Sequence, residues 1–198
     1  MIITKTPYRI SFFGGGSDYP SWYKKFGGSV LSTTIDKYIY ISCRELPPFF
    51  DHKYRIVWSK IENVKTINEI KHLTVRKLIK YNKIKSGLEI HYDGDLPARS
   101  GMGSSSSFSV GLMRALNNHQ HRDIKDIDLA YKTIFFEQKI MKETVGSQDQ
   151  IAASVGGFNK INFLKNDNIL IKKILSNNLK KLNSNLLLLY TGIQRNAK

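Results

Sequence analysis

The sequence is poor in cysteine, in acidic side chains and in long apolar runs. Its single cysteine, Cys43, excludes an intramolecular disulfide framework and a cysteine-rich zinc site, and such scarcity is typical of a reducing compartment. No run approaches the roughly 20 apolar residues that span a bilayer. Lys5 and Arg9 interrupt the first apolar stretch, which therefore lacks the continuous apolar centre of a secretion signal. We expect a cytoplasmic protein with no membrane partner.

The shortage of acidic residues leaves a net charge of +15 on 198 residues, of which 41% are hydrophobic. The apolar content excludes a disordered chain, and the charge by itself would suit a nucleic-acid partner. The excess is uneven: residues 53–85 carry 10 basic and 2 acidic side chains and residues 151–198 carry 8 and 1, whereas the rest nearly balances. Because the motifs described below lie in the balanced stretches, we interpret the excess as solvated lysine faces and expect no nucleic-acid partner.

Hydrophobic spacing predicts a mixed α+β fold. The expected strands are 2–6 and 9–13, interrupted by Pro7, then 29–35, 38–43, 53–59, 88–92, 158–163, 169–174 and 186–190. The expected helices are 69–82, 108–116 and 126–142, the last with Asp126 as its N-cap, and a short helix that starts near Asp149.

Glycine and serine residues of the kind that bind phosphate are concentrated in residues 97–107, between an expected strand and an apolar helix. A turn over residues 101–103, Gly-Met-Gly, lets backbone N–H groups approach an anion, and the dipole of the following helix favours negative charge there. The four serines that follow supply hydroxyl groups for phosphate oxygens or a hydrated Mg²⁺. A flexible turn with a helix cap is the alternative for the two glycines alone. The order strand, turn, serines, helix favours phosphate binding, although no Gly-Lys-Ser/Thr of a Walker loop follows.

Two carboxylates stand in unusual sequence surroundings. Glu137 shares the apolar face of an expected helix with Ile134 and Met141, where a carboxylate is costly unless it is paired, hydrogen-bonded or bound to a metal. A position at the solvent rim or beside a lysine is the alternative. Asp149 follows the Gly146 turn at the start of a short apolar helix, where an aspartate by itself is most often a helix cap.

The segments 6–19, 97–107 and 146–150 resemble, in order and spacing, the GHMP small-molecule kinases, a family that includes galactokinase, homoserine, mevalonate and phosphomevalonate kinases. Within that family, segments 14–20, 31–38 and 145–150 look most like the D-glycero-D-manno-heptose 7-phosphate kinases. The resemblance implies a ribosomal protein S5 domain 2-like α+β fold, with helices packed on a mixed or antiparallel sheet. It implies that residues 1–198 are the N-terminal ATP-binding domain, with the first strand of a C-terminal domain near 185–198 and the rest of that domain absent.

The resemblance also implies a site that takes ATP and Mg²⁺. The residues expected to cradle ATP are Pro97, Arg99, Ser100, Gly101, Met102, Gly103, Ser104, Ser105 and Ser106. Ser105 and Glu137 are the expected metal ligands, and Asp149 and Arg9 the expected catalytic residues. The residues expected to contact the sugar are Gly14, Gly15, Gly16, Ser17, Asp18 and Tyr19.

Two departures from the family's patterns qualify this site. The spacing from Glu137 to Asp149 is one residue longer than in the mevalonate kinase pattern. Gly15 and Gly16 replace the Glu-His pair of galactokinase-like members, which disfavours galactose as the substrate.

The implied activity is that of a phosphotransferase with an alcohol group as acceptor. It moves the ATP γ-phosphoryl group to the anomeric hydroxyl of a small-molecule sugar phosphate, by analogy a heptose 7-phosphate used for nucleotide-activated heptose. Another sugar-1-kinase, such as a fucokinase-like enzyme, is the near alternative. A non-catalytic, basic nucleic-acid-binding domain is the alternative from a different class.

Overall fold

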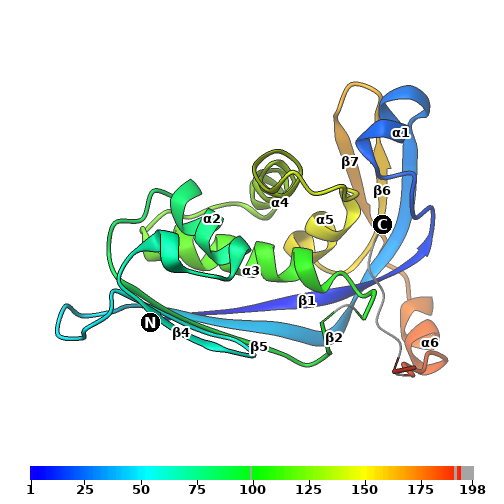
Figure 1. Cartoon of the computed structure of the whole chain (residues 1–198). Helices are drawn as coiled ribbons and strands as arrows, with labels where there is room; N and C mark the ends of the chain where they lie inside the picture. Colours follow the sequence, from blue (N-terminus) through cyan, green and yellow to red (C-terminus); the bar gives the residue numbers. More distant parts are fainter. Residues whose placement is uncertain (99, 190, 193–198) are drawn as a thin grey trace.

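In the computed structural model, which describes residues 1–98, 100–189 and 191–192, the described strands form one seven-stranded sheet (Figure 1). The strands are β1 (Ile2–Phe13), β2 (Gly28–Glu45), β3 (Tyr54–Val57), β4 (Ile61–Val64), β5 (Leu88–Gly94), β6 (Phe158–Phe163) and β7 (Ile169–Lys173). Their order is β4-β3-β5-β2-β6-β7, and β1 pairs with β2. Only the β3–β5 pairing is parallel among those observed. The predicted α+β class with a mixed sheet is therefore confirmed.

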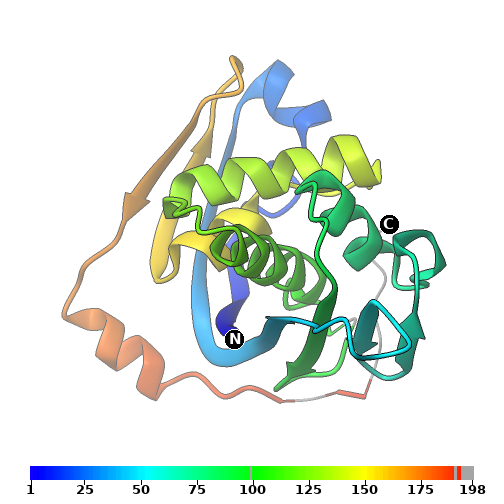
Figure 2. The ribbon, with the colours of Figure 1, turned by 90° about the vertical axis from the view of Figure 1, so that its left-hand side faces the viewer.

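The helices that shape the site lie on one face of the sheet, as Figures 1 and 2 show. The helical elements are α1 (Pro20–Phe26), a 3₁₀ turn (Ile67–Glu69), α2 (Leu73–Tyr81), α3 (Ser104–His119), α4 (Asp126–Phe135), a π-helical segment (Phe136–Met141), α5 (Gln148–Val155) and α6 (Asn178–Ser184). Helix α3 crosses β1 and β2 closely, because a Cβ atom on Gly111 would lie only 2.6 Å from Thr6 Oγ1. The Thr4 hydroxyl donates a hydrogen bond to the Gly111 carbonyl at 3.2 Å. The small residue thus lets the helix rest directly on the strand that carries Arg9.

The first two strands are longer than the sequence suggests. Pro7 was expected to interrupt the first strand, but it pairs with Tyr38 inside the continuous β1. The prediction of two separate segments is wrong because β1 pairs only with β2 among the described strands, and a strand edge tolerates a missing N–H group. The irregularity appears instead as a shift of register between Pro7 and Arg9. Likewise, the expected segments 29–35 and 38–43 form one strand, β2.

Two helix starts differ from those predicted. Helix α2 begins at Leu73 rather than at residue 69, because the Glu62 carboxylate accepts hydrogen bonds from the backbone N–H groups of Lys71, at 2.5 Å, and His72, at 3.1 Å. Helix α3 begins at Ser104, so the serines belong to the helix rather than to the loop before it. The strand β4, at residues 61–64, was not predicted.

The ends of two further elements also differ from expectation. Lys125, not Asp126, is the N-cap residue of α4; Asp126 lies in the first turn, where it accepts a hydrogen bond from Arg114 at 2.5 Å. Residues 126–141 are helical as predicted, although the last six form a π-helical segment. The predicted strand over 186–190 is absent at residues 186–189, and Tyr190 lies outside the described residues.

Interior packing follows the alternation of β1, β2 and β5. Tyr8, Ile41 and Ile90 are buried in one core cluster with Leu112 and Leu116 of α3, which are fully buried. Among the described residues, no helix combines the length and the apolar character needed to cross a membrane.

Candidate active site

Arg9 and Asp149 form the centre of the site. Arg9 Nε lies 2.6 Å from Asp149 Oδ1, and Arg9 Nη2 lies 2.8 Å from Asp149 Oδ2. The side chains are 14% and 24% exposed, so the pair is shielded from water but reachable. Burial raises the pKa of Asp149, and the Arg9 guanidinium opposes that rise. A two-point contact of this kind fixes the direction of the carboxylate oxygens.

The glycine loop before α3 lies against this pair. Arg9 donates from its backbone N–H to the Met102 carbonyl at 3.1 Å and from Nη1 to the Gly101 carbonyl at 2.9 Å. Gly101 and Gly103 have φ angles of +79° and +77°, the left-handed region that glycine adopts without strain. A Cβ atom on Gly103 would lie 3.3 Å from Asp149 Oδ2, whereas one on Gly101 would have no neighbour within 4 Å. At Gly103 the loop therefore packs in close contact with the Arg9–Asp149 pair.

Gly103 is the N-cap residue of the 16-residue helix α3, and no side chain among the described residues caps that end. The first backbone N–H groups of the helix are therefore free for an anion, which the helix dipole also favours. Ser104 is half-buried and Ser105 exposed at this end. The geometry can hold phosphate oxygens within the same small region as Asp149.

The other two serines point into the protein. The Ser106 hydroxyl is buried and donates to Glu137 Oε2 at 2.8 Å, and the Ser107 hydroxyl donates to the Pro7 carbonyl at 2.9 Å. Ser106, expected on the ATP phosphates, thus lies on the inner side of the first turn of α3, with its hydroxyl directed at Glu137. Of the remaining residues expected to cradle ATP, Pro97 is exposed, Ser100 is half-buried and Arg99 lies outside the described residues.

Glu137 is 2% exposed, which confirms that it belongs to the apolar face of its helix. Its Oε2 atom accepts hydrogen bonds from Ser106 and from Gln150 Nε2, while Oε1 has no hydrogen-bond partner among the described residues. Burial raises the pKa of the carboxyl group to about 7. The π-helical segment that carries Glu137 holds more residues per turn than an α-helix, so it can take up the extra residue in the spacing to Asp149.

The residues expected to hold Mg²⁺ fit a partial site. No group of three or more His, Cys, Asp or Glu side chains among the described residues could hold a metal by itself. The unpaired Oε1 atom of Glu137 is nevertheless an oxygen ligand of the kind that Mg²⁺ prefers, and the Ser106 hydroxyl donates to the other oxygen of this carboxyl group, whereas Ser105, the expected second ligand, is exposed on the same turn of α3. Mg²⁺ commonly completes its coordination with water and substrate phosphates. The residue types therefore suit a metal that arrives with a nucleotide.

The loop expected to contact the sugar is attached to the start of α5 through Asp18. The Asp18 carboxylate is 1% exposed and accepts hydrogen bonds from the backbone N–H groups of Gly16 and Gln148, both at 3.1 Å. A Cβ atom on Gly146 would lie 1.9 Å from Asp18 Oδ2, so a glycine is required there. Asp18 thus holds the loop beside Asp149, and its role as a sugar ligand stays a prediction.

The other members of this loop fall into two groups. A Cβ atom on Gly14 would lie 1.9 Å from the Ser29 carbonyl oxygen, and the Ser17 hydroxyl donates to the Gly14 carbonyl at 2.7 Å, so these two residues form the turn itself. Gly15 and Gly16 are exposed and border open space. Tyr19 lies close enough to Asp18 and Asp149 that, together with burial, they raise its pKa.

The sequence interpretation missed the glutamines on either side of Asp149. Gln150 is fully buried and binds Glu137, and Gln148 is 8% exposed at the first position of α5. The motif 145–150 contained this signal, because polar side chains that flank an aspartate in an apolar helix must find polar partners.

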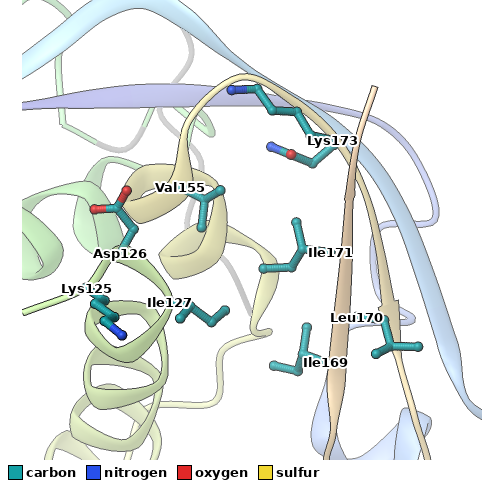
Figure 3. Close-up of a pocket in the computed structure, with 9 residues that line it drawn as sticks. Lys125, Asp126, Ile127, Val155, Ile169, Leu170, Ile171 and Lys173 are labelled. Atoms are coloured by element: carbon teal, nitrogen blue, oxygen red, sulfur yellow. The ribbon is translucent and has the colours of Figure 1, made fainter. Parts of the chain in front are cut away.

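Two large cavities lie away from these residues. One of about 540 Å³ separates α4 from β7, and Figure 3 shows Ile127, Ile169 and Ile171 around it, with Lys173 at its rim. Another of about 640 Å³ lies beneath α6. Neither cavity contains Arg9 or Asp149 among its lining residues.

Comparison with known proteins links the site to one family. Residues 66–157, which include the glycine loop, Glu137 and Asp149, match the family described as GHMP kinases N terminal domain. Over its whole length the chain is 29% identical to the D-glycero-alpha-D-manno-heptose 7-phosphate kinase of Campylobacter jejuni, covering 61% of that protein. It is also 25% identical to the galactokinase of Pyrococcus furiosus, with 98% of this chain and 54% of that protein covered.

Solved structures share the fold. A D-glycero-D-manno-heptose 1-phosphate kinase from Bacteroides thetaiotaomicron superposes with a TM-score of 0.81 at 24% identity, over 90% of this chain and 61% of that one. A mevalonate kinase superposes with a TM-score of 0.67 at 19% identity, over 93% and 59%. The chain thus spans between about half and three fifths of the length of these relatives.

Proposed function

Because residues 66–157 match the family described as GHMP kinases N terminal domain, we propose that this chain is the ATP-binding part of a small-molecule kinase. The proposed reaction transfers the γ-phosphoryl group of ATP to the anomeric hydroxyl of a sugar phosphate, with D-glycero-D-manno-heptose 7-phosphate as the substrate. The product would serve the cytoplasmic synthesis of nucleotide-activated heptose for lipopolysaccharide, capsule or S-layer.

The observation that carries this proposal is the position of the Arg9–Asp149 pair beside the uncapped end of α3. Phosphoryl transfer requires the phosphates to be held, the acceptor hydroxyl to be oriented and the developing charge to be balanced. The free N–H groups of α3 hold phosphate oxygens, and Asp149 accepts or orients the proton of the hydroxyl. Arg9 orients the Asp149 carboxylate and supplies positive charge 2.6 Å from it.

The proposal also includes a bound Mg²⁺. Glu137 and Ser105 would hold Mg²⁺, which neutralises phosphate charge when it is bound. Glu137 is buried behind the first turn of α3, and Ser106 and Gln150 orient its carboxyl group. Its unpaired Oε1 atom is the oxygen available to the metal.

One observation favours a heptose phosphate as the acceptor. The Campylobacter jejuni relative, whose name assigns it heptose 7-phosphate, is similar over the whole of this chain. Because the chain is also similar to a galactokinase, the test includes the substrates of other sugar-1-kinases.

The test is formation of ADP by the protein in the presence of Mg-ATP and a panel of acceptors. The panel contains heptose 7-phosphate, galactose, fucose and mevalonate, and Asp149→Asn serves as the negative control. We expect ADP with the heptose phosphate and little with the others. Turnover with fucose or galactose alone would reject the heptose assignment, and no turnover with any acceptor would reject the kinase.

A further inference from the structure

The connection between β2 and β3 carries two adjacent phenylalanines that the rest of the protein leaves uncovered. Phe49 is 90% exposed and Phe50 is 49% exposed. Pro47 and Pro48 precede them and restrict the backbone on that side of the turn. Figure 1 shows this connection, drawn in cyan, extending beyond the end of the sheet and away from the helices. Single exposed apolar side chains are normal, whereas two adjacent rings on a projecting tip mark an interaction site.

A basic hollow lies beside this aromatic tip. The hollow has a volume of about 460 Å³, its lining includes Lys53, Lys65 and Lys80, and no acidic side chain of the described residues lines it. Lys53 follows the tip closely in the chain, and its backbone N–H donates to the Val64 carbonyl at 3.0 Å. The aromatic tip and the hollow therefore share one end of the β3–β4 hairpin.

The ammonium groups around the hollow are not neutralised by the protein. Among the described residues none of the three lysines forms an ion pair, and Lys80 donates a hydrogen bond to the neutral Asn68 Oδ1 at 2.6 Å. Asp51 and Glu69, acidic residues nearby in the chain, lie outside the lining. Because residues 53–85 carry 10 basic and 2 acidic side chains, the hollow lies in a strongly positive stretch.

A second pair of lysines adds to the positive charge at this end. The Leu46 N–H donates to the Gly87 carbonyl at 3.0 Å, which places the connection between α2 and β5 beside the base of the aromatic tip. Lys83 and Lys85 lie in that connection, and both are exposed. The partner of this surface must therefore combine negative charge with an apolar interior.

An anionic lipid surface has both properties. Its headgroups attract lysine side chains, and the boundary between headgroups and acyl chains accepts aromatic rings. A single-stranded nucleic acid would instead stack its bases on rings that line a basic groove. Phe49 and Phe50 stand on a projecting tip and do not line the hollow, so the geometry favours insertion into a bilayer surface.

The aromatic tip lies at the end of the molecule away from the proposed active site. Strand β1 starts near this end, where Ile2 pairs with Cys43 of β2, and leads from there to Arg9. Figure 1 shows α1 and α6 at the opposite end of the molecule. A surface that contacts the aromatic tip would therefore leave the active site open to small molecules.

We propose that this chain docks peripherally on an anionic phospholipid surface. Phe49 and Phe50 insert between the headgroups, and the lysines of the hollow bind lipid phosphates beside them. The expectation of no membrane partner rests on the lack of a spanning segment, which a peripheral contact does not need. The proposal is independent of the proposed function.

The test is co-sedimentation of the full chain with vesicles of phosphatidylcholine and phosphatidylglycerol in equal parts, and with vesicles of phosphatidylcholine alone. We expect binding to the anionic vesicles that weakens as salt is added, and little binding to the neutral ones. Equal binding to the two kinds of vesicle, or none to the anionic ones, would overturn the proposal.

Two matched pairs of variants locate the contact. Phe49→Ser should weaken partition onto the anionic vesicles about tenfold, because it removes an inserted ring. It should leave the melting temperature unchanged, because the ring is exposed in the free protein. Phe26→Ser is the control: Phe26 is 65% exposed but lies on α1 at the other end of the molecule, so partition should be unchanged. Lys65→Gln should weaken partition several-fold, whereas Lys172→Gln, which removes the same charge from β7, should not.

The same variants distinguish a lipid surface from a nucleic acid. Binding of a labelled single-stranded RNA is measured by fluorescence anisotropy for the wild type and for Phe49→Ser. We expect Phe49→Ser to leave any RNA binding unchanged, because the phenyl ring acts only in the bilayer. A loss of RNA binding in Phe49→Ser, or equal vesicle partition of Phe49→Ser and Phe26→Ser, would overturn the proposal.

Discussion

Arg9 donates two hydrogen bonds to Asp149, from Nε at 2.6 Å and from Nη2 at 2.8 Å, although 140 positions separate them in the chain. The same guanidinium also donates to the Gly101 carbonyl, so one side chain joins β1, the glycine loop and the start of α5. The relative placement of the proposed phosphate and acceptor sites therefore depends on this residue.

Replacing Asp149 should separate chemistry from nucleotide binding. In Asp149→Asn the proposed proton acceptor is lost while the shape is kept, so we expect turnover to fall by about 10² or more. Nucleotide affinity, measured by calorimetry, should stay within a few-fold of the wild type because the N–H groups of α3 are untouched. Undiminished turnover would remove Asp149 from its proposed role.

Arg9→Lys tests the two-point contact. A lysine keeps the positive charge but cannot donate two parallel hydrogen bonds to one carboxylate. We expect a loss of turnover smaller than that of Asp149→Asn, with unchanged secondary structure by circular dichroism. Turnover equal to that of the wild type would show that charge alone suffices.

Gly103→Ala and Gly101→Ala form a matched pair, because both glycines have φ angles near +80° and both substitutions carry the same backbone strain. Only the methyl group at position 103 would press on Asp149, at 3.3 Å from Oδ2. We expect similar losses of melting temperature in the two variants but a further loss of turnover, at least several-fold, in Gly103→Ala. Equal turnover in both would contradict the contact.

Ser106→Ala and Ser105→Ala separate the interior from the surface of the same helical turn. Removal of the Ser106 hydroxyl takes a donor from the buried Glu137, which should lower the free energy of unfolding by about 1–3 kcal/mol. Ser105 is exposed, so its replacement should leave stability unchanged in urea titrations and raise the KM for Mg-ATP. A stability loss at Ser105 equal to that at Ser106 would contradict the assignment.

The raised pKa of Glu137 predicts that the free energy of unfolding depends on pH. Its pKa is raised from 4.5 to about 7 by burial, so between these values the folded protein binds more protons than the unfolded chain. The contribution of this group to the free energy of unfolding is therefore fully present below pH 4.5. It falls by up to roughly 3 kcal/mol as the pH rises to about 7. Glu137→Gln cannot titrate, so its stability relative to the wild type should be greater at pH 8 than at pH 5. A constant difference in urea titrations at the two pH values would refute the shift.

Several features of the fold could be predicted because they depend on neighbouring residues. Helical spacing correctly placed Glu137 on a buried face, and strand alternation predicted β5, β6 and β7 closely. Where the prediction failed, a distant contact had decided the outcome. Glu62, which lies in β4, accepts a hydrogen bond from the His72 N–H, so α2 starts only at Leu73. Pairing with β2 keeps β1 continuous at Pro7.

The features of the site likewise fall into those set by neighbouring residues and those set by distant contacts. The sequence by itself determined the glycine turn, the run of serines that follows it ahead of an apolar helix and a carboxylate at the start of another helix, since each depends on local backbone preferences and on hydrophobic periodicity. Only the tertiary structure decided that Ser106 rather than Ser105 contacts Glu137, because consecutive helical residues point about 100° apart and packing on β1 sets the rotation of α3. It likewise decided that Asp18 accepts a hydrogen bond from the Gln148 N–H and that Arg9 binds Asp149. The last two contacts join parts of the chain more than 100 residues apart, and sheet register and helix packing, which no local pattern encodes, bring them together.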